Sequence, residues 1–168
     1  MGSKPIQIVD EDDQPVKAAV KQEAWEQGLI HRVVRLVVEN SDGQVLLQHR
    51  TPTKDIYPNC WDVSVSGHVD AGETYDAALA HEIAEELGFQ DLQTTEIGSY
   101  RSNRIWKGLR FNRFNRCYKT RHDATPTHLE EGKIDGFKWF TVGEVKQLIK
   151  DHPDEVTDGL LEFFERYY

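Results

Sequence analysis

Glu82, Glu85 and Glu86 are the residues whose types and spacing are best suited to chemistry. On a helix, residues three and four positions apart are neighbours, so Glu82 would face both of the other glutamates. Like charges at this spacing oppose helix formation, and partial burial increases the repulsion unless a cation lies between the carboxylates. Hard oxygen ligands on a rigid helix suit Mg²⁺ or Mn²⁺, with waters and substrate phosphates completing the coordination shell. Three glutamates at this spacing are by themselves more typical of a solvated acidic helix face, and it is the residues around them that favour a divalent-metal site.

The residues around these glutamates predict a helix with a defined start and stop. Thr74 suits the N-cap position, and Gly88 supplies a C-terminal stop for a helix over 77–87. An apolar stripe is expected to anchor this helix, formed by Ala80, Ile83, Ala84 and Leu87. Upstream, Gly67 lacks a side chain, so its backbone carbonyl could approach a metal closely. Glu73 precedes the N-cap, where its charge complements the helix dipole.

Strands and helices alternate along the rest of the chain without a regular rhythm. Strands are predicted at 6–9, 32–38, 45–49, 61–66, 95–100, 108–120 and 136–140. Further helices are predicted at 16–28, at 141–152, where Thr141 and Glu144 match a capping box, and at 156–167. This pattern indicates an α/β fold in which helices cover both sides of a mixed sheet. We expect a single domain over residues 1–168, with a short strand and helix in 1–30 and the core in 31–168.

Composition and charge exclude several classes of protein. The 168 residues carry a formal net charge of -9, which argues against duplex nucleic acid as a partner because phosphate neutralisation requires a basic face. No stretch approaches the roughly 20 apolar residues of a membrane span. Two cysteines, Cys60 and Cys117, are too few for a disulfide scaffold and suit a reducing cytoplasm. An acidic protein that handles phosphates needs local basic groups or bound cations.

Residues 67–89 resemble the Nudix box. That motif is Gly, five residues, Glu, seven residues, Arg-Glu, an aliphatic residue, any residue, Glu-Glu, any residue, Gly and an apolar residue. The matching positions are Gly67, Glu73, Glu82, Ile83, Glu85, Glu86, Gly88 and Phe89. His81 is the sole departure and stands where the family has arginine. The resemblance extends in layout over the whole chain and implies the Nudix α/β/α sandwich, with a mixed β-sheet between helices.

The Nudix resemblance implies metal-assisted hydrolysis of a small-molecule diphosphate, such as a nucleoside diphosphate linked to another group. It implies a metal site made by Gly67, Glu82, Glu85 and Glu86. Relatives are often dimers, which makes a homodimer an expectation for this chain. The family draws its general base from the box or from a later loop, and we favour Glu82 or Glu85 over Glu130 or Glu131.

The arginine that the family has at position 81 usually pairs with the box glutamate found here as Glu73. His81 could take over that contact when it is protonated, or as a neutral hydrogen-bond donor. We therefore expect Glu73 and His81 to support the box structurally, through a contact that weakens as pH rises. A surface histidine without a role is the alternative.

A second set of residues is similar to the isopentenyl-diphosphate isomerase branch of the superfamily. The set is His31-Arg32-Val33-Val34, Gln48-His49-Arg50, Lys54, Tyr57-Pro58, Trp61 and Ser66-Gly67-His68. In that isomerase an arginine and a lysine matching Arg50 and Lys54 grip the substrate diphosphate, which implies the same role here. An exposed strand end and a loop lysine are the alternative for these two positions.

Departures from the isomerase favour hydrolysis over isomerisation. The catalytic cysteine of that enzyme falls on Ser66, and one of its histidine metal ligands falls near Ala24. Its later paired glutamates fall in 111–115, where this chain has no carboxylate. Two other function classes remain as alternatives: a non-catalytic Nudix domain that binds a diphosphate ligand, and an isomerase-like prenyl diphosphate enzyme.

Basic and aromatic residues interleave between positions 100 and 121. The basic residues are Arg101, Arg104, Lys107, Arg110, Arg113 and Arg116, and the aromatic ones are Trp106, Phe111 and Phe114. Such a mixture can stack a base and neutralise phosphate. It is also typical of amphipathic strands whose arginines extend into solvent.

Overall fold

The computed structural model of this protein describes residues 3–168. Met1 and Gly2, with which the predicted N-terminal segment 1–30 begins, lie outside the described residues. The strands are β1 (Ile6–Val9), β2 (Pro15–Ala19), β3 (His31–Glu39), β4 (Val45–Arg50), β5 (Trp61–Asp62), β6 (Val65–His68), β7 (Thr95–Trp106), β8 (Leu109–Arg121) and β9 (Ile134–Phe140). The helices are α1 (Lys21–Gln27), α2 (Tyr75–Leu87), α3 (Val142–Asp151), the 3-10 turn Pro153–Glu155 and α4 (Asp158–Tyr167).

Strand β3 is the centre of the sheet. It pairs in parallel with β8 along its whole length and antiparallel with β6, whereas its pairing with β4 is confined to Glu39 and Val45 next to the turn. Beyond that pair β4 diverges and continues with β9 and β5. The sheet is therefore mixed and opens between β6 and β4.

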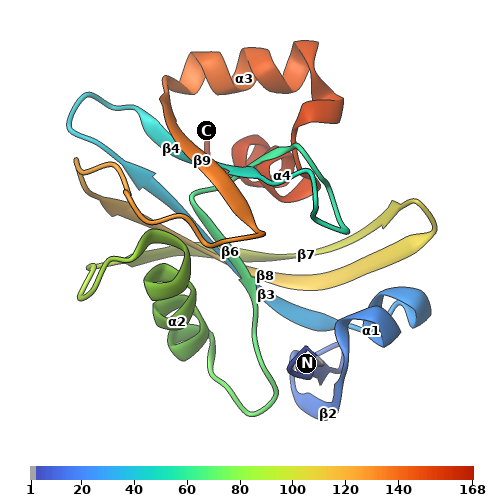
Figure 1. Ribbon diagram of the computed structural model, residues 1–168. Helices are drawn as coiled ribbons and strands as arrows, with labels where there is room; N and C mark the ends of the chain where they lie inside the picture. The colour runs from blue at the N-terminus through green and yellow to red at the C-terminus, as the bar shows by residue number, and fades with distance from the viewer. Residues whose placement is uncertain (1–2) are drawn as a thin grey trace.

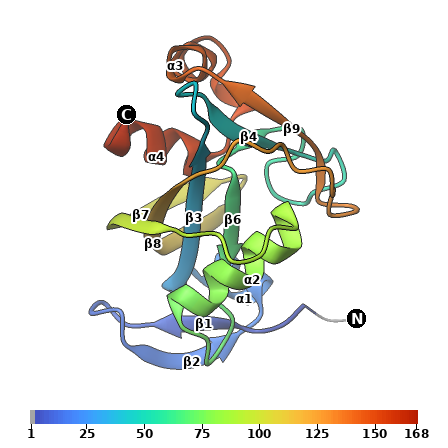
Figure 2. The same cartoon turned by 90° about the vertical axis from the view of Figure 1, so that its left-hand side faces the viewer.

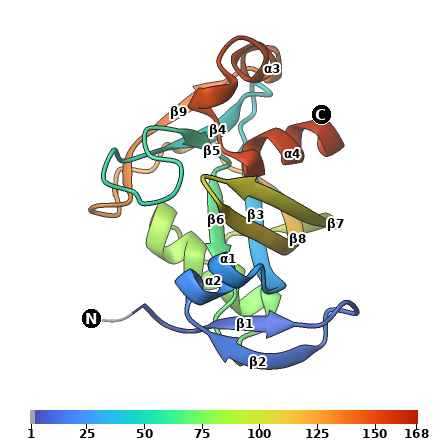
Figure 3. The same ribbon diagram turned by 90° about the vertical axis from the view of Figure 1, so that its right-hand side faces the viewer.

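Helices cover the sheet on opposite sides, as Figures 1 and 2 show. Side chains of β3 alternate between the two sides. Val34, Leu36 and Val38 pack against α2, whereas Val37 packs with the core under α3 and α4. Figure 3 shows α1 with β1 and β2 at the opposite end of the molecule from α3. The predicted α/β/α sandwich is confirmed.

The predicted strand over 61–66 is instead two short strands separated by Val63 and Ser64. The Ser64 hydroxyl donates to the Leu46 carbonyl and accepts the Val38 N–H at 2.8 Å. Ser64 thus bridges the two strands where they diverge, which satisfies backbone groups that no strand neighbour can reach. A hydrophobic alternation over 61–66 could not reveal this interruption.

The predicted helix over 16–28 was wrong in its first third. Pro15–Ala19 forms β2, which pairs with β1, and the helix begins only at Lys21. The stop at Gly28 is confirmed, because this glycine has the left-handed φ of 66°. Strand β7 extends to Trp106, beyond its predicted end at residue 100, because β8 pairs with it as far as Leu109. None of the helices in the described part of the chain combines the length and apolar character that a membrane crossing requires.

Candidate active site

Helix α2 has the predicted caps but a different buried face. The Thr74 hydroxyl accepts the Ala77 N–H at 3.1 Å, and Gly88 ends the helix with a φ of 69°. The buried face consists of Tyr75, Ala78, Leu79, Ile83, Glu86 and Leu87, and the stripe predicted to include Ala80 and Ala84 was half wrong because these two are exposed. Glu86 therefore lies on the buried side of the helix.

Glu86 is held by donors from the sheet. Glu86 is only 7% exposed. Its Oε2 accepts hydrogen bonds from the Ser66 backbone N–H and from the side-chain amide N–H of Gln48, each at 3.1 Å. Burial, reinforced by the neighbouring Glu82, holds the pKa of the Glu86 carboxyl well above its usual range. The carboxylate is thus fixed at the opening between β6 and β4.

Gly67 gives Glu82 room to lie directly against strand β6. A β-carbon at position 67 would fall 2.2 Å from the carboxyl carbon of Glu82, so any other residue there would displace the Glu82 carboxyl group. Burial, followed by repulsion from Glu85, raises the pKa of Glu82 to about 7. The structure therefore brings together three of the four predicted metal-site residues, namely Gly67, Glu82 and Glu86.

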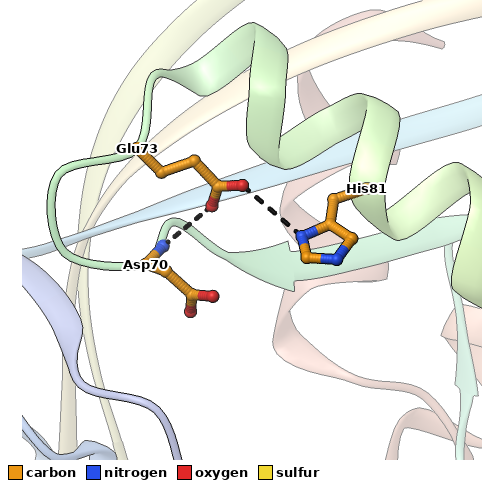
Figure 4. A group of neighbouring side chains, drawn as sticks. All are labelled: Asp70, Glu73 and His81. Atoms are coloured by element: carbon orange, nitrogen blue, oxygen red, sulfur yellow. Dashed lines mark hydrogen bonds and ion pairs between the residues drawn. The ribbon is translucent and has the colours of Figure 1, made fainter.

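Glu85 lies on the exposed side of α2, beside His81. The ring of His81 lies between two carboxylates, with Nδ1 3.5 Å from Glu73 Oε1 and Nε2 3.4 Å from Glu85 Oε1. Glu73 also accepts the Asp70 N–H at 3.1 Å, and Figure 4 shows both of its contacts. The predicted contact between Glu73 and His81 is confirmed, and it joins the loop after β6 to the second turn of α2.

The residues around Glu82 and Glu86 fit a divalent cation. After burial, the charge of Glu82 raises the pKa of Glu86 and that of Glu85 raises the pKa of Glu82, as expected of like charges held close together. Within residues 3–168, Asp70, Glu73 and His81 form a group of three close ligating side chains, which does not include the box glutamates. The contact between Glu73 and His81 accounts for that group without an ion. Glu82 and Glu86, with Glu82 against Gly67, offer carboxylate oxygens of the kind that suit Mg²⁺ or Mn²⁺.

A cavity of about 520 Å³ extends from these carboxylates. Basic side chains line it, as the acidic net charge requires of a phosphate-handling protein: Lys21, Arg35, Arg50, Lys54, Arg113 and Lys133. Burial, together with the nearby Arg50, lowers the pKa of Lys54 to about 8. Lys54 lines this cavity, and its contact with a diphosphate stays a prediction.

Arg50 has a structural task that the sequence did not reveal. Its Nε donates to the carbonyls of Ile56 and Tyr57 at 3.2 and 3.1 Å, and its Nη2 donates to Ile56 at 2.6 Å. These bonds hold the loop in which Tyr57 adopts a left-handed φ of 49°. Arg50 lines the cavity, but much of its donor capacity is directed at the protein's own backbone.

A buried arginine behind the site was missed by sequence reasoning. Arg35 is 3% exposed, and it donates to the Ser66 hydroxyl at 2.9 Å and to Asn115 Oδ1 at 3.0 Å. A β-carbon at Gly159 would fall 2.1 Å from its Nη1, so the start of α4 is shaped around this guanidinium. An arginine inside the apolar run of β3 was the available signal.

Comparisons with known proteins agree with this geometry. Residues 29–160 match the sequence model of the NUDIX domain. An uncharacterized Nudix hydrolase of Nostoc sp. is 31% identical over 165 residues, covering 97% of this chain and 95% of that protein. An uncharacterized Nudix hydrolase of Pseudomonas aeruginosa is 39% identical over 105 residues, covering 60% of this chain and 62% of that protein. An isopentenyl-diphosphate Delta-isomerase of Photorhabdus laumondii is 30% identical, covering 89% and 84% of the two chains.

Among solved structures, DR0079 of Deinococcus radiodurans has a TM-score of 0.82 at 28% identity, covering 98% of this chain and 99% of that one. The Nudix domain of Shewanella oneidensis NrtR, solved with ADP ribose, shares the fold with a TM-score of 0.62 at 15% identity. It covers 81% of this chain and 84% of that one. The chain belongs to the Nudix family and is a pyrophosphohydrolase of that family, whose members act on small-molecule diphosphates.

Proposed function

We propose that this protein is a divalent-metal-dependent hydrolase that cleaves the phosphoanhydride bond of a nucleoside diphosphate derivative. The observation that carries the proposal is the pairing of half-buried Glu82, which lies against Gly67 of β6, with buried Glu86, which accepts the N–H of the preceding residue Ser66. Two carboxylates with raised pKa values at the mouth of a basic cavity are suited to a dication and a diphosphate together. The dication would balance the negative charge of the carboxylates, and the diphosphate would balance the positive charge of the basic side chains that line the cavity.

Glu82, Glu86 and the Gly67 carbonyl would hold the ion, and Glu85 would complete the set from the exposed side. When bound, Mg²⁺ or Mn²⁺ would neutralise the diphosphate and stabilise negative charge on the leaving oxygen. The Ser66 N–H and the Gln48 amide keep Glu86 in one orientation through their bonds to Oε2. Arg35 in turn holds Ser66 from behind.

The reaction adds water across the phosphoanhydride bond. A water oxygen forms a bond to one phosphorus, the bond from that phosphorus to the bridging oxygen breaks, and the bridging oxygen leaves with the other phosphoryl group. A general base takes a proton from the water. We assign this role to a box glutamate, Glu82 or Glu85, of which Glu82 lines the cavity.

Glu130 is the residue against which this assignment must be tested. Its carboxylate pairs with Lys133, and its Oε2 is buried without a hydrogen-bond partner among residues 3–168. Its charge also contributes to the raised pKa values of Glu82 and Glu86, which places it near the site. Replacing each of Glu82, Glu85 and Glu130 with glutamine, and measuring both kcat and metal affinity, separates the candidates, because loss of the base lowers kcat by about 100-fold or more without weakening uptake of the ion.

Lys54 and the Nη1 group of Arg50 would contact the diphosphate. Lysine acts as a point charge towards phosphate, whereas arginine binds it through a planar fork. Since the Arg50 fork already engages Ile56 and Tyr57, its Nη1, 3.9 Å from Asp62, is the group left to reach a ligand. Lys54 is therefore the stronger candidate of the two.

The experiment is a screen of nucleoside diphosphates, nucleoside triphosphates, sugar nucleotides and prenyl diphosphates, with Mg²⁺ and with EDTA. Cleavage that requires the metal and is lost in Glu86→Gln supports the proposal. Tight binding without turnover would make the protein a ligand-binding Nudix domain instead. Sedimentation of the same preparation tests the expected homodimer.

Isomerisation is the second candidate because isopentenyl-diphosphate isomerases are among the relatives. The structure gives no thiol to the position of the isomerase cysteine, since Ser66 stands there and its hydroxyl accepts a hydrogen bond from Arg35. Both cysteines of the chain, Cys60 and Cys117, are buried, and neither lines the cavity. Interconversion of isopentenyl and dimethylallyl diphosphate in the screen would support this candidate.

A further inference from the structure

The first turn of helix α4 lies against a buried arginine of the central strand. Because Val34 and Leu36 of β3 face α2, the alternation of the strand directs Arg35 to the other side of the sheet, where α3 and α4 pack. Helix α4 follows the N-cap residue Thr157, and its second residue, Gly159, is buried against the guanidinium of Arg35. The start of the C-terminal helix is therefore in contact with a side chain of the central strand.

Two polar anchors fix this first turn of α4 to the sheet. The Thr157 hydroxyl donates to Asp62 Oδ1 at 2.8 Å, and the Thr157 N–H donates to the Trp61 carbonyl at 3.0 Å. On the other side, Asp158 accepts a hydrogen bond from Arg113 Nη2 at 2.7 Å. The side chains of Thr157, Asp62 and Arg113 are all buried. The start of the helix is thus held in place from both sides.

The basic and aromatic segment between positions 100 and 121 supplies part of this attachment. Arg104 Nε donates to Glu162 of α4 at 2.7 Å, in addition to the bond between Arg113 and Asp158. The ion pairs made by two further arginines of the segment are Arg101 with Glu11 and Arg116 with Glu96. These pairs favour the amphipathic-strand interpretation of the segment.

Arg35 connects the start of α4 to strand β6. Its Nη1 donates to the Ser66 hydroxyl at 2.9 Å, and its Nε donates to Asn115 Oδ1 at 3.0 Å. The Ser66 N–H in turn donates to Glu86 Oε2 at 3.1 Å. One arginine side chain and one residue of β6 therefore separate α4 from a carboxylate of the metal site.

Gly159 leaves room for the guanidinium in this position. Its φ is not positive, so the backbone does not require glycine there, and alanine is normally the better residue within a helix. A β-carbon at position 159 would overlap Arg35, with Nη1 and Cζ as its nearest atoms. Because α4 is anchored on both sides, the guanidinium rather than the helix would have to shift. Nη1 is also the atom that bonds Ser66, so this bond would be lengthened or lost.

We propose that Gly159 and Arg35 are positioning residues for the metal site, which hold Glu86 in place through Ser66. Contacts that orient a metal ligand from outside the coordination shell can be worth about 10- to 100-fold in metal affinity. Gly159 and Arg35 would act in this way without touching the ion themselves. The inference rests on the proposed function and extends the metal site to the C-terminal helix.

Gly159→Ala and Gly143→Ala form a matched pair of variants. Gly143 is the second residue of α3 after the N-cap Thr141, as Gly159 is the second residue of α4 after Thr157. Beyond its chain neighbours in the described structure, the nearest atom to a β-carbon at Gly143 would be Thr141 Oγ1, at 3.9 Å. In calorimetric titrations with Mn²⁺, Gly159→Ala should bind the ion about 10-fold or more weakly than wild type does, whereas Gly143→Ala should bind it equally well.

Hydrogen exchange of the Ser66 amide, measured in EDTA, tests the same connection without metal. Because this N–H is bonded to Glu86, its exchange should become about 10-fold or more faster in Gly159→Ala and stay unchanged in Gly143→Ala. A second background isolates the route. Arg35→Lys removes the forked group that meets position 159, so adding Gly159→Ala to it should change Mn²⁺ affinity by less than about 2-fold.

Mn²⁺ affinity and Ser66 exchange equal to those of wild type in Gly159→Ala would overturn the inference, as would a loss of affinity that persists in the Arg35→Lys background. If Gly159→Ala does not fold, Ser66→Ala decides, because it removes the hydroxyl bonded by Arg35 and keeps the N–H bonded to Glu86. Wild-type affinity in Ser66→Ala would then overturn the inference. Faster Ser66 exchange in Gly159→Ala, with no uptake of Mn²⁺ by wild type, would instead remove the proposed function and leave the positioning of Glu86 standing.

Discussion

Gly67 and Glu82 are in such close contact that the carboxyl group of Glu82 occupies the place of a side chain on Gly67. A β-carbon there would lie 2.2 Å from the Glu82 carboxyl carbon and 2.4 Å from its Oε1. The strand and the helix of the box are therefore matched to each other at this one point. Displacement of Glu82 by a single methyl group should disturb the site while the fold persists.

Gly67→Ala should lower kcat/KM by about 100-fold, because a shift on the order of 1 Å in a catalytic group can cost that much. Gly136→Ala is the matched control, since Gly136 also lies in a strand and a β-carbon there meets nothing within 4 Å. Steady-state kinetics on the two variants, with circular dichroism to check folding, decides the matter. Equal activity of both variants would contradict the role given to Gly67.

Glu82→Gln should stabilise the metal-free protein near neutral pH. The folded-state pKa of Glu82 is raised to about 7, so its contribution to stability is present below the unfolded value of 4.5 and is lost as pH rises through 7. Removing the charge should therefore increase the free energy of unfolding by roughly 2 kcal/mol at pH 7.5 and change it little at pH 4.5. Urea denaturation in EDTA at the two pH values measures this difference. An equal change in the free energy of unfolding at both pH values would contradict the raised pKa of Glu82.

Lys54 should produce an alkaline limb in the pH profile of kcat/KM. Burial beside Arg50 lowers the pKa of Lys54 to about 8, so the free enzyme loses this positive charge as pH rises through 8. Diphosphate binding should weaken in the same range, because kcat/KM reports the pKa values of the free enzyme. Lys54→Arg keeps the charge and should move the limb to higher pH, whereas Lys54→Met should raise KM by about 10-fold or more. A limb that is identical in Lys54→Arg would assign it to another group.

His81→Ala should weaken the attachment of the loop after β6 to helix α2. The ring lies 3.5 Å from Glu73 and 3.4 Å from Glu85, so its removal breaks both contacts. The side chain is 45% exposed, so the effect on the free energy of unfolding should not exceed about 1 kcal/mol. His81→Arg restores the residue of the family motif and should preserve the attachment. Thermal unfolding and activity of His81→Ala that equal those of wild type would refute the role of this contact.

The sequence predicted those parts of the fold that depend on local signals. Thr74, Gly88 and the Thr141–Glu144 capping box define helix ends through bonds within a few residues, and all three are confirmed. Elements that depend on a distant partner were predicted less well. Pro15–Ala19 is a strand because β1 lies beside it, and β7 reaches Trp106 because β8 continues opposite it.

The same distinction holds for the candidate site. The spacing of Glu82 and Glu86 is local and was visible in the sequence, whereas the side of α2 that is buried was set by β3 and β6. The contact of Arg35 with Gly159 joins residues far apart in the chain, and the arginine in the apolar run of β3 gives no indication of that partner. The bonds from Arg50 to the carbonyls of Ile56 and Tyr57 are closer in sequence but depend on the conformation of the loop. The cytoplasmic location and the homodimer stay predictions.

The most direct test of the metal site is a calorimetric titration of Mn²⁺ and Mg²⁺ into wild type and Glu86→Gln. Glu165→Gln provides a matched control, because it makes the same change at an exposed residue of α4 that does not line the cavity, and it should not weaken uptake of a dication. We predict that wild type takes up at least one ion per chain and that Glu86→Gln weakens the affinity by about 10-fold or more. No uptake by wild type, with or without a diphosphate present, or equal affinity in Glu86→Gln, would contradict a metal-dependent hydrolase.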